Sequence, residues 1–346
     1  MAEVATKKSK NTGRIVGTVT ETNFKYNKDL VDNFDSSIKG GYEKKEFKNP
    51  FLVVRVNTES EDGTPIVTYV KVDGFSVMSK YKTYDGEIKE NPAYKGIKNL
   101  LAMDNGGVGA RIQLNTASLG ENSYYKDGSL VSFPIINLKY VESDQDKVAK
   151  DDLAEFCVCG VITDMKHEKD ADGSETGRLL IDLAFSRKGD GTLSVLKNLV
   201  VPADDLGDGQ TLAEAFEDGM GIEDRVQLNI ENVTVRTGTV TAGKSIGKKK
   251  ATIVTGKATN EFHVFNGEVL AYGSDEYISE EAFEQGKTLR KAELSGKKKK
   301  AEEKAENNSS NGRKSIGSRI AKASEDYAEE GGLMEFDVEE DDNPFA

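Results

Sequence analysis

Short runs in which apolar or β-branched residues alternate with polar ones cover most of the chain before Tyr272. Such alternation has a period of two, which is typical of strands with one buried face. In the first half of this region, strands are predicted at 14–19, 51–56, 66–72, 111–115 and 130–141. A glycine interrupts the first run, which indicates a bulge or a sharp bend. A short helix is predicted between the third and fourth strands, because apolar residues recur there with helical spacing and glycine follows.

The same order of elements recurs further along the chain. The segment Arg-Ile-Gln-Leu-Asn at 111–115 reappears as Arg-Val-Gln-Leu-Asn at 225–229, and the flanking pattern agrees. A helix is expected in the second copy at 211–216, and strands are expected at 157–162, 179–185, 193–201, 225–229 and 251–264. Three strands, a helix and two strands, with a bent first strand, are typical of the five-stranded OB-fold barrel. The sequence therefore predicts an all-β protein with tandem OB-folds and short helices, although a β-sandwich fits the strand count nearly as well.

The composition changes after Tyr272, where the chain becomes polar and low in complexity. Such sequence is typical of a flexible linker, here a basic one around 297–300 with a possible short helix before it at 280–293. The linker then meets a tail that carries only acidic charges. The predicted organisation is a basic N-terminal arm, two OB-fold-like domains, a basic linker and an acidic tail, at 1–11, 12–145, 150–272, 273–324 and 325–346.

Charge and length narrow the possible functions. The 346 residues include 47 Lys and Arg and 60 Asp and Glu, and ten of these acids lie in the tail. The rest of the chain is therefore nearly neutral, so any nucleic-acid binding must depend on local positive loops. No apolar run approaches the roughly 20 residues of a membrane helix, and no signal peptide is evident. We expect a cytoplasmic protein that contacts no membrane; if a phage encodes it, this is the host cytoplasm.

Aromatic rings are interleaved with lysines in the predicted loop 24–48, which joins the first two strands of the first copy. Phe24 and Phe47 are expected in the core, whereas the tyrosines can stack on bases, worth roughly 1 to 3 kcal/mol each. The last hairpin of the second copy is basic and contains no acid between Asn232 and Asn260. Lysines there can neutralise phosphates, although a loop made basic only for solubility is the alternative. The candidate DNA-binding residues are Tyr26, Lys28, Tyr42, Lys44, Lys45, Arg55, Tyr124, Tyr125, Lys126, Arg236, Lys244, Lys248, Lys249 and Lys250.

Motifs for catalysis are weak. Residues 238–245 fit the P-loop pattern Gly-x-x-x-x-Gly-Lys-Ser, but glycine and β-branched residues follow where a helix is required. The chain has two histidines and two cysteines, at spacings unlike any compact metal site. The two repeated arginines, Arg111 and Arg225, are expected to serve the fold. We predict no catalytic residues, no metal and no cofactor, and hence no enzyme.

The chain ends with Asp341, Asp342, Asn343, Pro344, Phe345 and Ala346. An apolar anchor such as Phe345 or Phe336 beside negative charge suits a basic-rimmed pocket on a partner protein, although a tail kept acidic only for solubility is the alternative. This ending resembles the C-terminal tip of bacterial and bacteriophage single-stranded-DNA-binding proteins, in which acidic residues lead into Pro-Phe. In the bacterial form Phe is the last residue, whereas here Ala346 follows it.

The resemblance implies a non-catalytic protein that coats and protects single-stranded DNA and recruits replication and recombination proteins through its tail. The tail residues expected to contact a partner are Phe336, Asp341, Asp342, Pro344 and Phe345. Two other functions remain open from the sequence. One is a phage structural or assembly protein with tandem β-domains, and the other is a P-loop nucleotide-binding protein that uses Lys244.

Overall fold

The chain is built mainly from β-strands, so the predicted all-β class is confirmed. The computed structural model describes residues 9–24, 46–59, 65–74, 76–82, 87–187, 191–207, 209–241 and 253–310. No helix in this part of the chain is long and apolar enough to cross a membrane.

The first five long strands form a closed ring. Each strand pairs with the next, and the last pairs with the first, in the order β1 (Asn11–Asn23), β3 (Phe51–Glu59), β4 (Pro65–Asp73), β9 (Ser129–Asn137) and β8 (Arg111–Lys126). All neighbours are antiparallel except β4 and β9, which meet in parallel. Helix α1 (Pro92–Leu101) and the short 3-10 helix η2 (Asp104–Gly107) lie in sequence between the third and fourth strands. Two short two-stranded ribbons precede α1 in the chain: β2 (Glu46–Lys48) with β5 (Ser76–Met78), and β6 (Lys80–Lys82) with β7 (Ile88–Glu90).

The remaining strands form a second closed ring with the same order. Its members are β10 (Leu153–Lys169), β11 (Glu175–Ser186), β12 (Leu193–Val201), β14 (Ile253–Val269) and β13 (Arg225–Thr241). Helix α2 (Leu212–Gly219) again falls between the third and fourth strands. This is the order expected for an OB-like barrel, and a closed ring of strands excludes the sandwich alternative.

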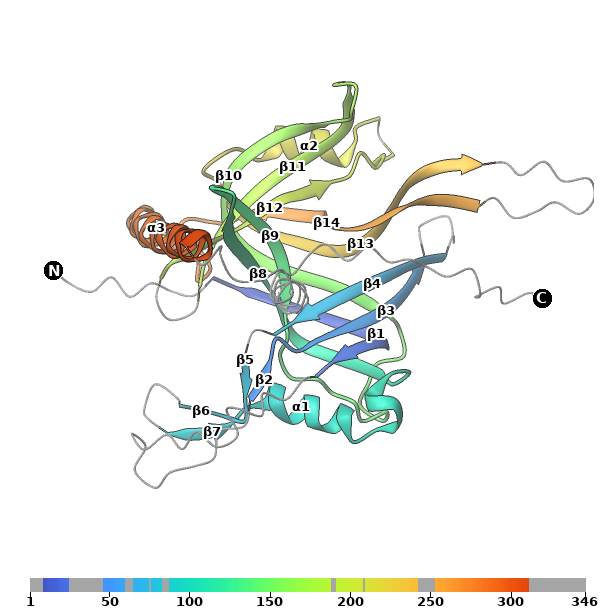
Figure 1. Ribbon diagram of the computed structural model, residues 1–346. Helices are drawn as coiled ribbons and strands as arrows, with labels where there is room; N and C mark the ends of the chain where they lie inside the picture. Colours follow the sequence, from blue (N-terminus) through green and yellow to red (C-terminus); the bar gives the residue numbers. More distant parts are fainter. Residues whose placement is uncertain are drawn as a thin grey trace, which may run out of the picture.

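The two barrels join through their first strands (Figure 1). β1 pairs with β10 in antiparallel fashion from Asn11↔Val158 to Val16↔Leu153, so all ten long strands belong to one continuous sheet. At the middle of this seam Gly13 faces Phe156, and a Cβ on Gly13 would lie 2.2 Å from Cδ1 of that ring. The seam can therefore close only with glycine on one side of the pair.

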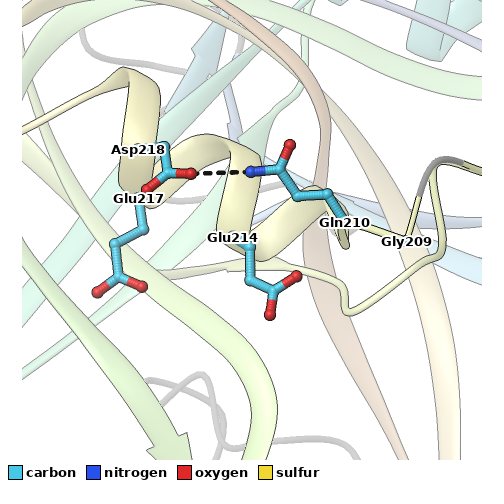
Figure 2. Close-up of a pocket in the computed structure, with 5 residues that line it drawn as sticks. All are labelled: Gly209, Gln210, Glu214, Glu217 and Asp218. Atoms are coloured by element: carbon cyan, nitrogen blue, oxygen red, sulfur yellow. Dashed lines mark hydrogen bonds between the residues drawn. The ribbon is translucent and has the colours of Figure 1, made fainter.

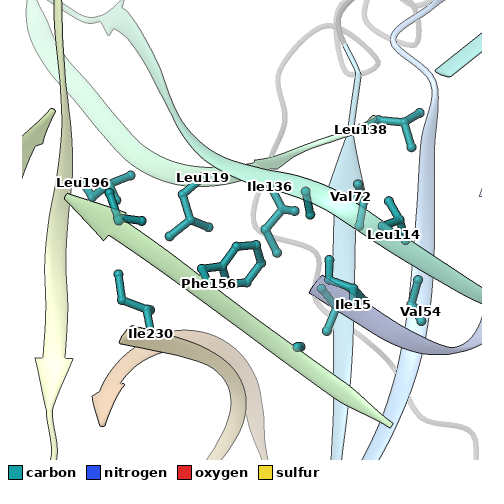
Figure 3. Close-up of a cluster of buried hydrophobic side chains, with 14 of the residues drawn as sticks. Ile15, Val54, Val72, Leu114, Leu119, Ile136, Leu138, Phe156, Leu196 and Ile230 are labelled. Carbon is teal, nitrogen blue, oxygen red and sulfur yellow. The ribbon is translucent and has the colours of Figure 1, made fainter. Parts of the chain in front are cut away.

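Alternating residues of the strands fill the barrel interiors, and both barrels contribute to one apolar cluster (Figure 3). Ile15, Leu114 and Val54 come from the first barrel, while Leu196 and Ile230 come from the second. Full burial of such a side chain stabilises the fold by roughly 1.5 to 3 kcal/mol. Phe47, expected in the core, is fully buried, with its ring centroid 5.1 Å from that of Tyr94.

Local sequence explains where the two short helices begin. The Asn91 side chain accepts a hydrogen bond from the Ala93 N–H, and proline occupies the first turn of α1. Thr211 and Glu214 form a reciprocal capping box at the start of α2. Both helices bury an apolar face against the barrels.

Helix α3 (Glu280–Ser310) differs from the prediction. The sequence suggested a short helix at 280–293 and a flexible linker after it, but the helix runs for 31 residues and includes Lys297 to Lys300. Alanine, lysine and glutamate, which favour helices, dominate its second half. Its first half is held by Phe283, which is 2% exposed and packs with Ile278 against Val161, Ala184 and Leu193. Tertiary packing that a polar sequence pattern does not reveal therefore places this helix.

Candidate nucleic-acid interface

The outer surface of β3 and β4 carries cations and aromatic rings next to each other. Inward-pointing residues alternate along both strands with outward positions, among which Val53 is only 1% exposed. We call the outward residues Phe51, Arg55, Tyr69 and Lys71 the β3–β4 face. Arg55 is exposed and lies opposite Tyr69 in the strand pairing. The Lys71 ammonium lies 5.0 Å from the centre of the Phe51 ring and 3.3 Å from an Asp73 oxygen. Burial raises the pKa of Asp73 even though Lys71 counteracts it.

The basic hairpin of the second barrel crosses β4 beside this face. The Tyr69 N–H donates to Thr234 Oγ1 at 3.0 Å, and Asn260 Nδ2 donates to the Tyr69 carbonyl at 2.6 Å. Thr68 Oγ1 accepts a weaker bond from the Thr234 N–H at 3.4 Å. Thr234 and Asn260 belong to β13 and β14, so these bonds fix the hairpin against the first barrel (Figure 1). Arg236 follows Thr234 by two residues in β13.

The hairpin formed by β8 and β9 makes the reciprocal contact with the second barrel. Glu121 of β8 accepts hydrogen bonds from the Val195 N–H of β12 at 2.9 Å and from Ser132 Oγ at 2.7 Å. It also forms a two-pronged ion pair with Arg290 of α3. Burial raises the pKa of Glu121, but the hydrogen bonds from Arg290, Val195 and Ser132 outweigh burial and hold this pKa below its usual value. Glu121 is therefore a charged anchor between the first barrel, the second barrel and α3.

Tyr124 and Tyr125 point to opposite sides of the same hairpin. The Tyr124 ring packs edge-on against Phe133, with centroids 6.3 Å apart. Tyr125 lies on the side of Glu121 and lines a cleft against α3. Lys126 is exposed at the end of β8, where Asp127 and Gly128 make the turn with positive φ. The two tyrosines therefore do not form one stacking platform.

Many of the candidate residues fall outside the described part of the chain. Arg55 lies in the β3–β4 face, and Tyr124, Tyr125 and Lys126 lie at the end of the β8–β9 hairpin; for Arg236 only the strand is described. The candidates outside the described residues are Tyr26, Lys28, Tyr42, Lys44, Lys45, Lys244, Lys248, Lys249, Lys250 and the tail residues Phe336, Asp341, Asp342, Pro344 and Phe345. Tyr69, Lys71 and Phe51 are not among the residues predicted from the sequence, although the alternation in 65–73 places Tyr69 and Lys71 on the outward side.

The two repeated arginines hold the segment that follows each barrel, as predicted. Arg111 donates to the carbonyls of Ala149 and Lys150 and pairs with Asp152 at 2.5 Å. Arg225 donates to the carbonyl of Ile278 at 3.1 Å and pairs with Glu280 at the start of α3. Both guanidinium groups are therefore engaged in contacts within the chain.

The segment that matches the P-loop pattern is not followed by the helix that a P-loop requires in the described part of the chain. Residues 238–241 lie in β13, paired with residues 253–256 of β14. Residues 242–252 lie outside the described part of the chain, and strand β14 begins directly after them at Ile253. No helix begins in the described residues on either side of this gap. The phosphate-binding helix that the motif requires is therefore not found in the described part of this region.

A cavity of about 560 Å³ beside α2 has the wrong charge for nucleic acid. Glu214, Glu217 and Asp218 line it together with Gly209 and Gln210, whose amide donates to Asp218 (Figure 2). Carboxylates repel phosphate, so this cavity is not a DNA contact.

The described histidines and cysteines show ordinary structural environments. His167 pairs with Glu217 at 3.1 Å and His263 with Glu261 at 2.9 Å. Cys159 is fully buried, and burial raises the pKa of its thiol to about 12. No group of three or more metal-binding side chains occurs among the described residues.

Comparisons with known proteins gave one family match and distant structural matches. A sequence model of the YorF family matches residues 10–308. The wild-type single-stranded DNA binding protein from Thermus aquaticus superposes with a TM-score of 0.45 at 13% identity, over 77% of this chain and 95% of that one. A deletion mutant of the same protein gives 0.43 at 12% identity, over 76% and 96%. No curated protein sequence matches the chain.

Proposed function

The chain belongs to the YorF family, and we propose that it binds single-stranded DNA without reading its sequence. The observation that carries this proposal is the β3–β4 face, where Arg55 and Lys71 lie beside Tyr69 and Phe51 on the outside of a barrel. Strands two and three of an OB-fold are the surface on which oligonucleotides bind. A face that combines cations with rings suits a single strand, because its unpaired bases can stack while its phosphates meet positive charge.

The crossing hairpin strengthens this proposal. β13 and β14 are bonded to β4 at Tyr69, so the base of this hairpin, at Thr234 and Asn260, is anchored next to the β3–β4 face. The sequence between Asn232 and Asn260 contains six basic residues and no acid. In this proposal the basic hairpin of the second barrel adds positive charge to the binding surface of the first. In this mechanism Arg55, Lys71 and the basic hairpin hold the phosphates, and the rings stack bases.

The tail has a separate role in this proposal. We propose that residues 325–346 recruit replication and recombination proteins, with Phe336, Pro344 and Phe345 as apolar anchors among carboxylates. The domain limits 12–145 and 150–272 and a cytoplasmic location belong to the same proposal. No step of it requires catalysis.

A titration with single- and double-stranded DNA at about 50 and 200 mM salt tests the function. Quenching of tyrosine fluorescence can report binding, since the chain contains no tryptophan. We expect tighter binding of the single strand and an affinity that falls as salt rises. A chain lacking 325–346 should bind the strand equally well or more tightly while losing partner capture.

Either of two results would overturn this account. Equal binding of duplex and single strand, or no salt-dependent binding of a single strand, contradicts the proposed function. Loss of DNA binding on removal of the tail contradicts only the division of roles between the barrels and the tail.

A further inference from the structure

Helix α3 and the end of β8 enclose a basic cleft of about 310 Å³. Its walls carry one aromatic ring, Tyr125, and four cations from a single helix, and no acidic side chain lines it. The lining residues are Tyr125, Lys287, Arg290, Lys291, Leu294, Ser295 and Lys298. We call this site the α3 cleft. It lies outside the β3–β4 face, and all its lining residues except Tyr125 of β8 come from α3.

We propose that the α3 cleft is a second contact for single-stranded DNA, in which Tyr125 stacks on a base while Lys291 and Lys298 lie along the phosphates. This inference rests on the proposed function and extends it beyond the barrels to the helix that follows them. It also assigns a role to Tyr125, which the hairpin geometry separates from Tyr124.

The lysines of the cleft form a stripe along α3. Lys287, Lys291 and Lys298 are four and seven residues apart, which places them on one side of a helix. At about 1.5 Å of rise per residue they extend over about 16 Å, enough to follow several nucleotides. Such a row of cations neutralises successive phosphates and needs no base-specific contact.

The cations of the cleft differ in how far they are already neutralised. Arg290 is paired with Glu121, and Lys287 lies 2.5 Å from Glu284 and over the Phe283 ring. Lys291 has no ion pair with any residue that the structure describes, and Lys298 meets Glu302 only at 4.0 Å, with both side chains more than half exposed. Lys291 and Lys298 therefore carry the charge that a ligand can use.

The cleft is held rigidly from both sides. Gly286 lets α3 approach β12 closely, since a Cβ there would lie 2.7 Å from Leu193 Cγ. Arg187 pairs with Glu293 at 2.6 Å, and Lys297 donates to Ser123 Oγ at 2.8 Å. Glycine inside a helix costs roughly 1 kcal/mol relative to alanine, so its place here fits a helix whose position matters. A preformed cleft binds without the cost of ordering the helix.

The test compares two double variants of the full chain that remove the same charge from the same helix. K291Q/K298Q removes the lysines of the cleft, and K299Q/K300Q removes two exposed lysines that do not line it. Each variant is titrated with an oligothymidine of about 8 nucleotides, which a single OB-fold can cover, and with one of about 32 nucleotides, which is long enough to cover two. Tyr125→Leu, which removes the ring, and Tyr125→Phe, which keeps it, form a second matched pair.

We expect K291Q/K298Q to weaken binding of the long oligomer several-fold. In a plot of the logarithm of the binding constant against the logarithm of the salt concentration, the slope should become shallower by about 1.4. Binding of the short oligomer, which the β3–β4 face can hold alone, should change much less. Tyr125→Leu should weaken binding of the long oligomer about tenfold, because the base loses its stacking partner, whereas Tyr125→Phe should bind it as the unaltered chain does. K299Q/K300Q should bind both oligomers as the unaltered chain does.

The outcomes separate this inference from the proposed function. If the unaltered chain binds single strands and the two lysine variants bind the long oligomer equally well, the α3 cleft is not a DNA contact and the β3–β4 proposal stands. If the unaltered chain binds no oligomer, both proposals are wrong.

Discussion

Gly13 and Phe156 meet at the centre of the seam between the two barrels. The strands that carry them are the first strands of the two copies, so the pair joins one element with its own repeat. Phe156 is 2% exposed and its ring packs edge-on against Phe262, which leaves it no room to turn away from β1. A large residue on one strand therefore requires the smallest residue on the other.

We expect Gly13→Ala to destabilise the protein by about 1 to 3 kcal/mol, the usual cost of overpacking a filled core. The added Cβ would also lie 2.9 Å from the Glu155 carbonyl oxygen, so moving the ring alone does not relieve the strain. Urea denaturation measures the change, with Gly219→Ala as the control because a Cβ at Gly219 meets no atom within 4 Å. Equal stability of the two variants would show that the seam is not tightly packed.

At the scale of elements, a buried ion pair and a small apolar cluster attach α3 to the barrels, together with the more exposed pairs Arg187–Glu293 and Arg225–Glu280. The side chains of Glu121 and Arg290 are 2% and 16% exposed, and they lie 169 residues apart in the chain. A repeat and an alternating pattern predicted the strands of both barrels from local sequence. They could not predict this helix position, because a contact between Glu121 and Arg290 leaves no periodic signal in either segment.

Glu121→Gln should release α3 from β8 and cost about 3 kcal/mol, since it leaves the Arg290 guanidinium buried without its counter-charge. Glu284→Gln, which breaks an exposed pair with Lys287, should cost at most about 1 kcal/mol. Hydrogen exchange along 280–300 reports the release, and denaturation reports the cost. Protection of α3 that is equal in both variants would contradict this role of Glu121.

The same pair sets a dependence on pH. The pKa of Glu121 is lower in the folded chain than in the unfolded chain. The ionised Glu121 side chain therefore contributes its full share to the free energy of unfolding at any pH above the pKa of the unfolded carboxyl. It is lost as the pH falls through the lower pKa of the folded state. The difference between the unaltered chain and Glu121→Gln should therefore be largest near neutral pH and shrink in acid.

For the whole molecule, two reciprocal hairpins bind the barrels to each other. β8 and β9 reach β12 through Glu121, and β13 and β14 reach β4 through Thr234 and Asn260. This exchange puts the base of the β13–β14 hairpin, at Thr234 and Asn260, against β4 of the other barrel. The sequence predicted that the basic hairpin and Arg55 bind DNA, but it did not predict Phe51, Tyr69 or Lys71. It also could not predict that the hairpin reaches the first barrel, because nothing local to 232–260 indicates a contact with Tyr69.

The central claim is that single-stranded DNA lies on the β3–β4 face, and the affinity of Arg55→Gln/Lys71→Gln for oligothymidine tests it most directly. Lys95→Gln/Lys98→Gln, on the exposed side of α1 in the same barrel, removes the same charge and serves as the control. We predict that the first variant binds at least several-fold more weakly, with a logarithmic salt slope lower by about 1.4, while the control binds as the unaltered chain does. Equal affinity of the two variants would contradict the claim.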